Sequence, residues 1–184
     1  MTKVIKTPRA KRVGKGLIRA VERAGSKDDR GPTAAHKDAA VRDQTVCKSC
    51  GVVFARKTWR RSAARLQAAT QQGVVSGTCP ACRLVAEGRA FGRVVIEGSY
   101  VPGHLEELIR RIRNVAARAE FTQPERRLVE VVSRESRLEV LTTSQKLAHR
   151  LARELAKAFH GAVSYNWSDR DGSLLAVWRR DEKR

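Results

Sequence analysis

The sequence has 184 residues, with 38 Lys and Arg against 19 Asp and Glu and a formal net charge of +19. Its 41% apolar residues can form a modest core and exclude wholesale disorder, whereas an aromatic content of 5% argues against an aromatic-lined ligand pocket. No apolar run approaches the roughly 18 residues that span a bilayer, and the N-terminal stretch lacks the apolar segment of a secretory signal. We therefore expect a cytoplasmic protein with reduced thiols and no membrane partner.

The excess positive charge is concentrated in the first half of the chain. Residues 1–44 contain 12 Lys and Arg against 5 Asp and Glu, and residues 45–92 contain 8 against a single acid, Glu87. Residues 93–184, with 18 against 13, have the mixed charge of an ordinary globular surface. A surface with so few acids attracts a polyanion, because released counterions favour the complex. Nucleic acid is the expected partner, with an anionic membrane or a charge that serves only solubility as the alternatives.

Residues 1–44 are predicted to form a flexible, disordered basic arm. The segment contains several Gly and Pro residues and too little apolar surface to offset the entropy of ordering. Arms of this composition often become ordered on RNA, so we expect Lys11, Arg12 and Lys15 to contact the phosphate backbone. The alternative is a solvated tail with no binding role.

Four cysteines, all in two C-x-x-C pairs, predict a metal site at Cys47, Cys50, Cys79 and Cys82. A tetrahedral zinc ion needs four converging thiolates, and a two-residue gap lets a tight turn present both sulfurs of a pair. Gly51 suits the left-handed backbone that such a turn needs. Two redox disulfides are the competing interpretation, but a thioredoxin-like site uses one C-x-x-C and not two. Four thiolates leave no open position on the ion, so the zinc is expected to be structural rather than catalytic.

The spacer between the two pairs is expected to contain a basic helix, so that residues 45–92 form a zinc-ribbon-like module with an inserted helix. Residues 57–72 contain no Pro or Gly and are rich in Ala, and Trp59, Ala63 and Leu66 recur at helical spacing. The rest of this segment carries the cations that we expect to contact phosphates, namely Arg56 just before the helix and then Lys57, Arg60, Arg61 and Arg65.

Residues 93–184 are predicted to form an α+β domain. The order strand, helix, strand, strand, helix, strand, with one more strand after it, is the split β-α-β arrangement of ferredoxin-like folds with an added C-terminal strand. Thr142 and Gln145 have the spacing of a capping box at the start of the second helix, and Gly161 is expected to close that helix. The predicted strands are residues 94–96, 128–132, 138–141, 162–167 and 173–178, and the first predicted helix is residues 104–119.

One face of this sheet is expected to be covered by both helices and the other to face solvent or a partner. The open face could show Tyr165, Trp167 or Trp178, and exposed aromatic rings on a sheet can stack single-stranded bases. The aromatic-rich strand signature of RNA-recognition motifs is not found in the sequence. We therefore favour burial of Trp167 and Trp178 against a helix or against the zinc module.

Nothing in the sequence predicts an active site. The four histidines, His36, His104, His149 and His160, are scattered and form no ligand pair. The sequence contains no phosphate-binding loop, nucleophile elbow or Gly-rich dinucleotide turn. We therefore expect that the protein is not an enzyme.

Several motifs together carry a family resemblance over roughly residues 45–180. They are Cys47-x-x-Cys50-Gly51, Trp59, Cys79-Pro80-Ala81-Cys82-Arg83, Gly92-x-Val94-x-Ile96-x-Gly98 and His104-x-x-Glu107. In these motifs the chain resembles an uncharacterised family of short bacterial zinc-ribbon proteins. That family is similar to the N-terminal zinc-binding region of the eukaryotic nuclear-export adaptor of the large ribosomal subunit and its archaeal relatives. The resemblance implies contact with ribosomal RNA and ribosomal proteins. The further cysteines and domains of the adaptor have no counterpart here, so export activity is not carried over.

The sequence thus favours a non-catalytic, zinc-stabilised RNA-binding protein that is associated with the ribosome and contacts phosphates through a basic helix and arm. A DNA-binding or transcription-related zinc protein is the first alternative, because both nucleic acids are phosphate polyanions. A redox-sensitive protein-interaction adaptor, which loses zinc when its thiols are oxidised, is the second.

Overall fold

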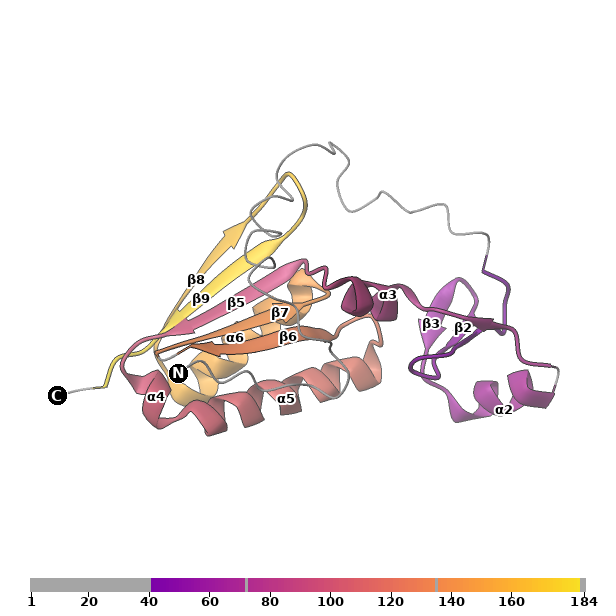
Figure 1. Cartoon of the computed structure of the whole chain (residues 1–184), viewed down its shortest axis with the longest axis horizontal. Coiled ribbons are helices and arrows are strands. Elements are labelled where there is room, and N and C mark those ends of the chain that lie inside the picture. Colours follow the sequence, from indigo (N-terminus) through magenta and orange to yellow (C-terminus); the bar gives the residue numbers. More distant parts are fainter. Residues whose placement is uncertain (1–40, 72, 135, 183–184) are drawn as a thin grey trace.

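The structure, a computed structural model, describes residues 41–71, 73–134 and 136–182. Two mixed sheets lie at opposite ends of this part of the chain (Figure 1). The small N-terminal sheet has the strand order β3-β2-β1-β4, in which β1 and β4 are parallel and the other neighbours antiparallel. Its strands are β1 (Val46–Cys47), β2 (Val53–Ala55), β3 (Thr58–Arg60) and β4 (Ser76–Gly77), and the helices beside it are α2 (Ala63–Gln71) and α3 (Pro80–Glu87).

The helix predicted over residues 57–72 is wrong in its first third. Strands β2 and β3 form a hairpin in which Ala55 pairs with Thr58, so that Arg56 and Lys57 are the whole turn. Both turn residues have positive φ, 51° and 64°, as a two-residue turn of the I′ type requires. The β-branched and aromatic residues on either side, such as Phe54 and Trp59, favour strands and pair across the hairpin. The helix therefore begins only at Ala63.

The large sheet has five strands in the order β6-β7-β5-β9-β8. Strands β5 and β9 are parallel, and every other neighbouring pair is antiparallel. The strands are β5 (Gly92–Glu97), β6 (Leu128–Arg134), β7 (Arg137–Thr142), β8 (Ala162–Trp167) and β9 (Leu174–Arg179). The helices are α4 (Tyr100–Gly103), α5 (Leu105–Thr122) and α6 (Gln145–Phe159). The α+β prediction and its order of elements are thus confirmed, with the short α4 as an addition.

The core of the large sheet lies on the face that α5 and α6 cover. Alternate strand residues such as Val94, Val140 and Trp178 are fully buried there against the helices. Helix α6 contributes Leu147 and Leu151, because its apolar residues recur every three or four positions and form one face. Among the described residues, no helix is both long enough and apolar enough to cross a membrane.

The position of the last strand differs from that in the predicted ferredoxin-like sheet, which has a strand added at its end. Strands β5 and β6 are parallel with β7 between them, which is the expected split β-α-β unit. The strand that follows α6, however, is β8 at the sheet edge, and β9 lies between β8 and β5. The sequences of the two strands agree with this order. Strand β9 (LLAVWR) is apolar nearly throughout, as a central strand requires, whereas β8 (AVSYNW) contains polar residues and is mostly exposed.

Two local predictions about α6 need correction. Its N-terminal cap is Ser144, whose side chain accepts a hydrogen bond from the backbone of Lys146 at 3.2 Å. Thr142 is instead the last residue of β7, and its buried hydroxyl donates to the carbonyl of Ser144 at 2.9 Å. At the other end the capping residue is His160, with a φ of 59°, and Gly161 follows it with a φ of 91°. Gly161, predicted to be the cap, is therefore the residue after the cap and two positions beyond the last helical residue, Phe159.

Candidate metal centre and basic surface

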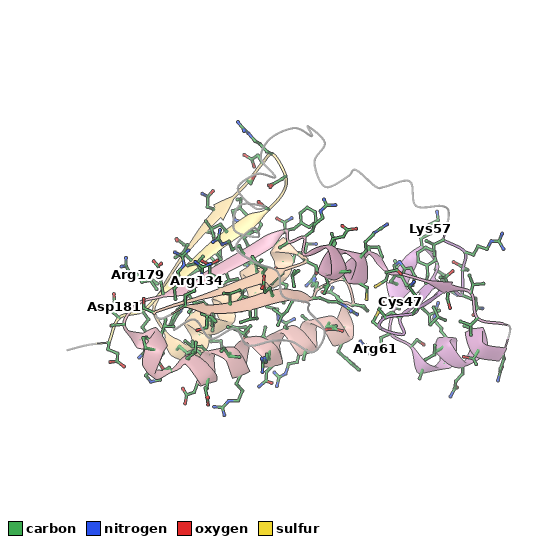
Figure 2. All side chains as sticks on the ribbon, in the orientation of Figure 1. Cys47, Lys57, Arg61, Arg134, Arg179 and Asp181 are labelled. Carbon is green, nitrogen blue, oxygen red and sulfur yellow. The ribbon has the colours of Figure 1, made fainter. Side chains whose placement is uncertain are left out.

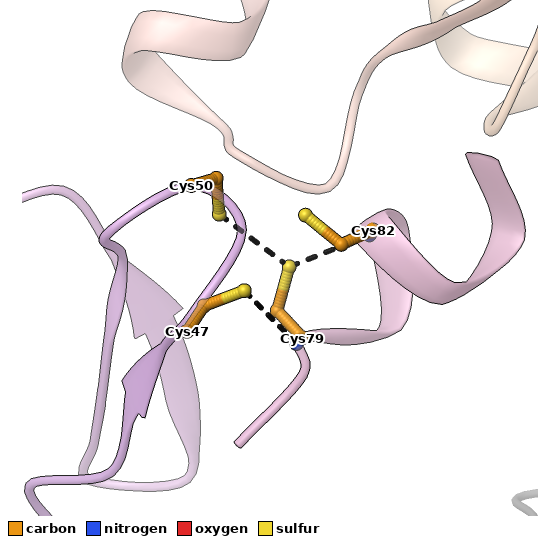
Figure 3. A group of neighbouring side chains, drawn as sticks. All are labelled: Cys47, Cys50, Cys79 and Cys82. Carbon is orange, nitrogen blue, oxygen red and sulfur yellow. Dashed lines mark hydrogen bonds between the residues drawn. The ribbon is translucent and has the colours of Figure 1, made fainter. Parts of the chain in front are cut away.

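The first cysteine pair lies on a tight turn that follows β1. Cys47 is the last residue of β1 and is almost fully buried, while Cys50 is partly exposed. The backbone of Gly51 donates to the carbonyl of Cys47 at 2.8 Å, and the φ of Gly51 is 71°. A glycine is therefore needed here because L side chains avoid this conformation. The turn directs both sulfurs toward the start of α3 (Figure 3).

The second pair lies at the N-terminus of α3. Cys79 is the capping residue, and its sulfur accepts a hydrogen bond from the backbone of Cys82 at 3.4 Å. The backbone of Cys79 in turn donates to the sulfur of Cys47 at 3.3 Å. Pro80 occupies the first turn, where its missing N–H removes no helix bond. Amide donors and the positive end of the helix dipole both favour thiolates at this point.

The four cysteine sulfurs converge on one point, as predicted. All four ligand atoms lie within 4.8 Å of one another, and the sulfurs of Cys50 and Cys79 are 3.7 Å apart. A tetrahedral zinc–thiolate site with bonds of about 2.3 Å has sulfurs about 3.8 Å apart. The four thiols are free and three of them are buried. The cluster can therefore hold a metal ion, and its four sulfur ligands fit a thiophilic, tetrahedral one.

Hydrogen bonds and burial give three of the cysteine thiols different pKa values. The hydrogen bond with Cys79 lowers the pKa of Cys50 to about 4, and the same contact raises the pKa of Cys79. Burial raises the pKa of Cys82 to about 11. Cys50 is therefore the more acidic partner of its contact with Cys79, and because a metal ion binds thiolates, its binding would release protons from the cluster.

Arg127 joins this cluster to the α+β domain. It lies between α5 and β6, and its Nη1 donates to the sulfur of Cys82 at 3.2 Å. Its Nε donates to the carbonyl of Pro124 at 2.9 Å, and its Nη2 forms an ion pair with Glu120 at 3.2 Å. Burial opposes the charge of Arg127, but the negative charges at Cys50, Glu120 and Cys82 raise its pKa overall. A permanent positive charge therefore faces a cluster that becomes anionic when its thiols ionise.

Replacing Arg127 by Gln is expected to lower the affinity of the cluster for its metal ion about 10- to 100-fold, as is typical when a partner of a metal ligand is lost. The variant leaves the thiolates without the neutralising charge and breaks the contact with the α+β domain. Competition with a chromophoric chelator measures this affinity. Arg126→Gln is the matched control, since Arg126 carries the same charge and pairs with Glu125 instead. Equal metal affinity in both variants would contradict the role assigned to Arg127.

The basic residues predicted to contact RNA lie on a hairpin and its continuation rather than on one helix. Arg56 and Lys57 are exposed at the turn of the hairpin, and Arg60 is exposed on β3. Lys57 is labelled in Figure 2. Arg61 follows β3 and forms a 3.4 Å ion pair with Glu120 of α5. Of the five cations, Arg65 alone is part of α2. All five lie within residues 56–65, which we call the basic hairpin segment.

Other predicted residues fall outside what the structure describes. Lys11, Arg12 and Lys15, together with nearly all of the predicted arm, precede residue 41.

The two tryptophans of the C-terminal hairpin differ in exposure, because Trp178 is fully buried while Trp167 is 48% exposed. The predicted burial is therefore right for Trp178 and wrong for Trp167.

Sequence reasoning missed two parts of the site. Helix α3 has recognisable signals, since Pro80 is in its first turn and Gly88 closes it with a φ of 67°. Arg127 has no such signal, because it is 45 positions from Cys82 and reaches it only through the tertiary fold.

Comparison of the chain with protein-family profiles, with curated proteins and with solved structures gives no match.

Proposed function

We propose that the protein is a non-catalytic, zinc-stabilised RNA-binding protein associated with the ribosome. In this proposal zinc occupies the four-cysteine cluster, and the basic hairpin segment contacts phosphates, with the residues of the N-terminal arm adding further contacts along the RNA. The binding surface is set by the metal-stabilised module, and the α+β domain supports it.

The conformation of the hairpin turn carries this proposal. Arg56 and Lys57 both adopt a left-handed backbone, at a cost of roughly 1–2 kcal/mol for each L residue with a side chain. Asn-Gly is the usual sequence of such a turn. Two long cations in place of it lower stability while adding charge at the most protruding point of the hairpin. Backbone strain retained in this way is typical of functional positions.

The charge around the turn supports the same proposal. Glu87 is the single acid in residues 45–92, and it lies on α3, where it forms a 3.7 Å ion pair with Arg89. No acid within residues 45–92 therefore competes with phosphates for the cations of the basic hairpin segment, and Arg61 is paired with Glu120 of α5, outside the module. Ions released from RNA on binding would make the affinity strongly dependent on salt.

Zinc is the metal that best fits the cluster and its role. Structural zinc sites with four cysteines are closed and tetrahedral, which agrees with the sulfur spacing. The module has few other buried apolar residues, chiefly Val46, Val52 and Val53. A core this small needs a metal to be stable.

The choice of RNA over DNA, and of the ribosome as its source, rests on the resemblance of the sequence motifs to a bacterial zinc-ribbon family that is in turn similar to the zinc-binding region of the ribosomal export adaptor. Co-sedimentation of the full chain with ribosomal subunits tests this choice. Binding that resists DNase but is lost on RNase treatment supports it. Tighter binding to DNA than to RNA of the same sequence would favour the DNA-binding alternative.

The triple variant Arg56→Asn, Lys57→Gly, Arg60→Gln is expected to weaken RNA binding about 10- to 100-fold, since it removes three phosphate contacts. The first two changes give the turn its preferred sequence, so the fold should be retained or strengthened. Fluorescence anisotropy with a labelled ribosomal RNA fragment measures the affinity.

The matched control removes three exposed arginines from α5, as Arg110→Gln, Arg113→Gln, Arg118→Gln. It lowers the net charge by the same amount at a different place. An equal loss of affinity in the two triple variants would contradict a binding role for the hairpin.

A further inference from the structure

An exposed pair of aromatic rings lies at the edge of the large sheet. Tyr165 and Trp167 are two residues apart on the edge strand β8, with exposed fractions of 36% and 48%. They pair in register with Ala176 and Leu174 of β9, so they lie on the same face of the sheet as the helices. Helix α6 covers β9 there but leaves the two rings of β8 open to solvent. Large aromatic side chains exposed side by side mark a binding surface more often than a folding feature.

His149 of α6 orders these rings from the inner side. Its ring lies 4.8 Å from that of Tyr165 and 6.0 Å from that of Trp167, measured between centroids, at tilts of 38° and 37°. The three rings therefore form a continuous aromatic surface, which we call the aromatic platform (His149, Tyr165 and Trp167).

A row of cations on α6 runs beside the aromatic platform. It consists of Lys146, Arg150, Arg153 and Lys157, all exposed and spaced four, three and four residues apart, so they share the outer face of the helix. Arg153 is near enough to Tyr165 to oppose the rise in the phenol pKa that burial causes. The acid of α6, Glu154, points away to α5, where it pairs with Arg111 at 2.5 Å.

We propose that the aromatic platform and the cations of α6 bind an unpaired strand of RNA, with bases stacked on Trp167 and Tyr165 and phosphates along α6. This inference rests on the proposed RNA-binding function and adds the form of RNA that is recognised. Aromatic rings beside a positively charged groove are the common means of binding single strands without sequence preference.

The spacing of the rings favours a single strand over a duplex. Two residues along a strand span roughly 6.6 Å, about twice the 3.4 Å rise per nucleotide in a duplex strand. Bases that contact both rings must therefore be separated from one another, which a duplex does not allow. The four cations extend over roughly 16 Å of helix, enough for several phosphates of an extended strand.

Anisotropy titrations of the full chain test this inference with two probes, an oligouridylate of about 12 nucleotides and an RNA duplex of similar length. The double variant Tyr165→Ala, Trp167→Ala is expected to bind the oligouridylate about 10- to 100-fold more weakly and the duplex with unchanged affinity. Tyr165→Phe, Trp167→Phe should retain most of the affinity because it keeps both rings. Oligothymidylate in the same assay separates an RNA strand from any single strand.

Two controls match these variants. Phe121→Ala removes another strongly exposed aromatic residue, from α5, and should not affect binding. Lys146→Gln, Arg150→Gln, Arg153→Gln should weaken oligouridylate binding more than the equally charged triple variant of α5, Arg110→Gln, Arg113→Gln, Arg118→Gln.

The outcomes separate this inference from the proposed function. Wild-type affinity of the Tyr165→Ala, Trp167→Ala variant for the oligouridylate would overturn the inference, while a loss of RNA binding in the hairpin variant would still support the proposed function. No binding of either RNA by the wild-type protein would overturn both. If the Tyr165→Ala, Trp167→Ala variant lost affinity equally for the oligouridylate and for the duplex, the inference would also be overturned, because stacking on the rings requires free base faces.

Discussion

Replacing Cys79 by Ser is expected to abolish metal binding and to unfold the small N-terminal module. Cys79 contributes one of the four sulfurs, contacts the sulfur of Cys50 and caps α3. Structural zinc supplies an apparent binding free energy of about 10–16 kcal/mol, far more than the few buried valines of the module. Metal analysis should find no bound ion, and hydrogen exchange should become fast across residues 45–91 while the buried strands β5 and β9 remain protected.

Ser49→Ala is the matched control for this variant. Ser49 lies between the two cysteines of the first pair and is exposed, so its loss should leave both the metal and the fold intact. Retention of slow exchange in the module of the Cys79→Ser variant would contradict a fold that depends on the metal. Uniform unfolding of both sheets would instead contradict their separate cores.

Replacing Trp178 by Ala is expected to lower the free energy of unfolding of the α+β domain by about 3–5 kcal/mol. Trp178 is fully buried on β9 among the core residues, and its ring lies edge-on to Tyr100. Its indole N–H donates to the carbonyl of His160 at 2.7 Å, so the variant also leaves that carbonyl without its partner. Urea unfolding followed by circular dichroism measures the change.

Trp167→Ala is the matched control, since it removes the same side chain from the neighbouring strand. Trp167 is about half exposed, so its loss should cost well under the 3–5 kcal/mol expected for Trp178. Similar losses in the two variants would contradict the burial assigned to Trp178 and the open position assigned to Trp167.

The metal cluster could be predicted from the sequence because its geometry is mostly local. Each C-x-x-C spacing keeps two sulfurs close together, and Gly51 indicates the turn that the first pair requires. The order of elements in the α+β domain could be predicted for a similar reason. Alternation along its strands and the helical spacing of Leu147, Leu151 and Leu155 are properties of neighbouring residues.

The hairpin was missed because its local signals conflict. Residues 63–71 form a helix as their alanines predict, and the absence of Gly and Pro extends that pattern back to Lys57. The usual Asn-Gly signal of a two-residue turn is replaced by Arg56 and Lys57. Only the pairing of Val53 with Arg60 and of Phe54 with Trp59 decides in favour of strands.

The remaining features depend on contacts between distant parts of the chain. Arg127 reaches Cys82 because it directly precedes β6, which contacts α3, and no spacing in the sequence encodes that proximity. The exposure of Trp167 likewise follows from β8 being an edge strand that α6 covers only in part. The insertion of β9 between β5 and β8 decides which tryptophan is buried.

The salt dependence of RNA binding by the metal-loaded protein tests the account most directly. If the cations of the hairpin and the arm neutralise about seven phosphates, a plot of the logarithm of affinity against that of salt concentration should have a slope of about −5 to −6. A slope near zero would contradict the central claim that a metal-stabilised module presents its cations to RNA.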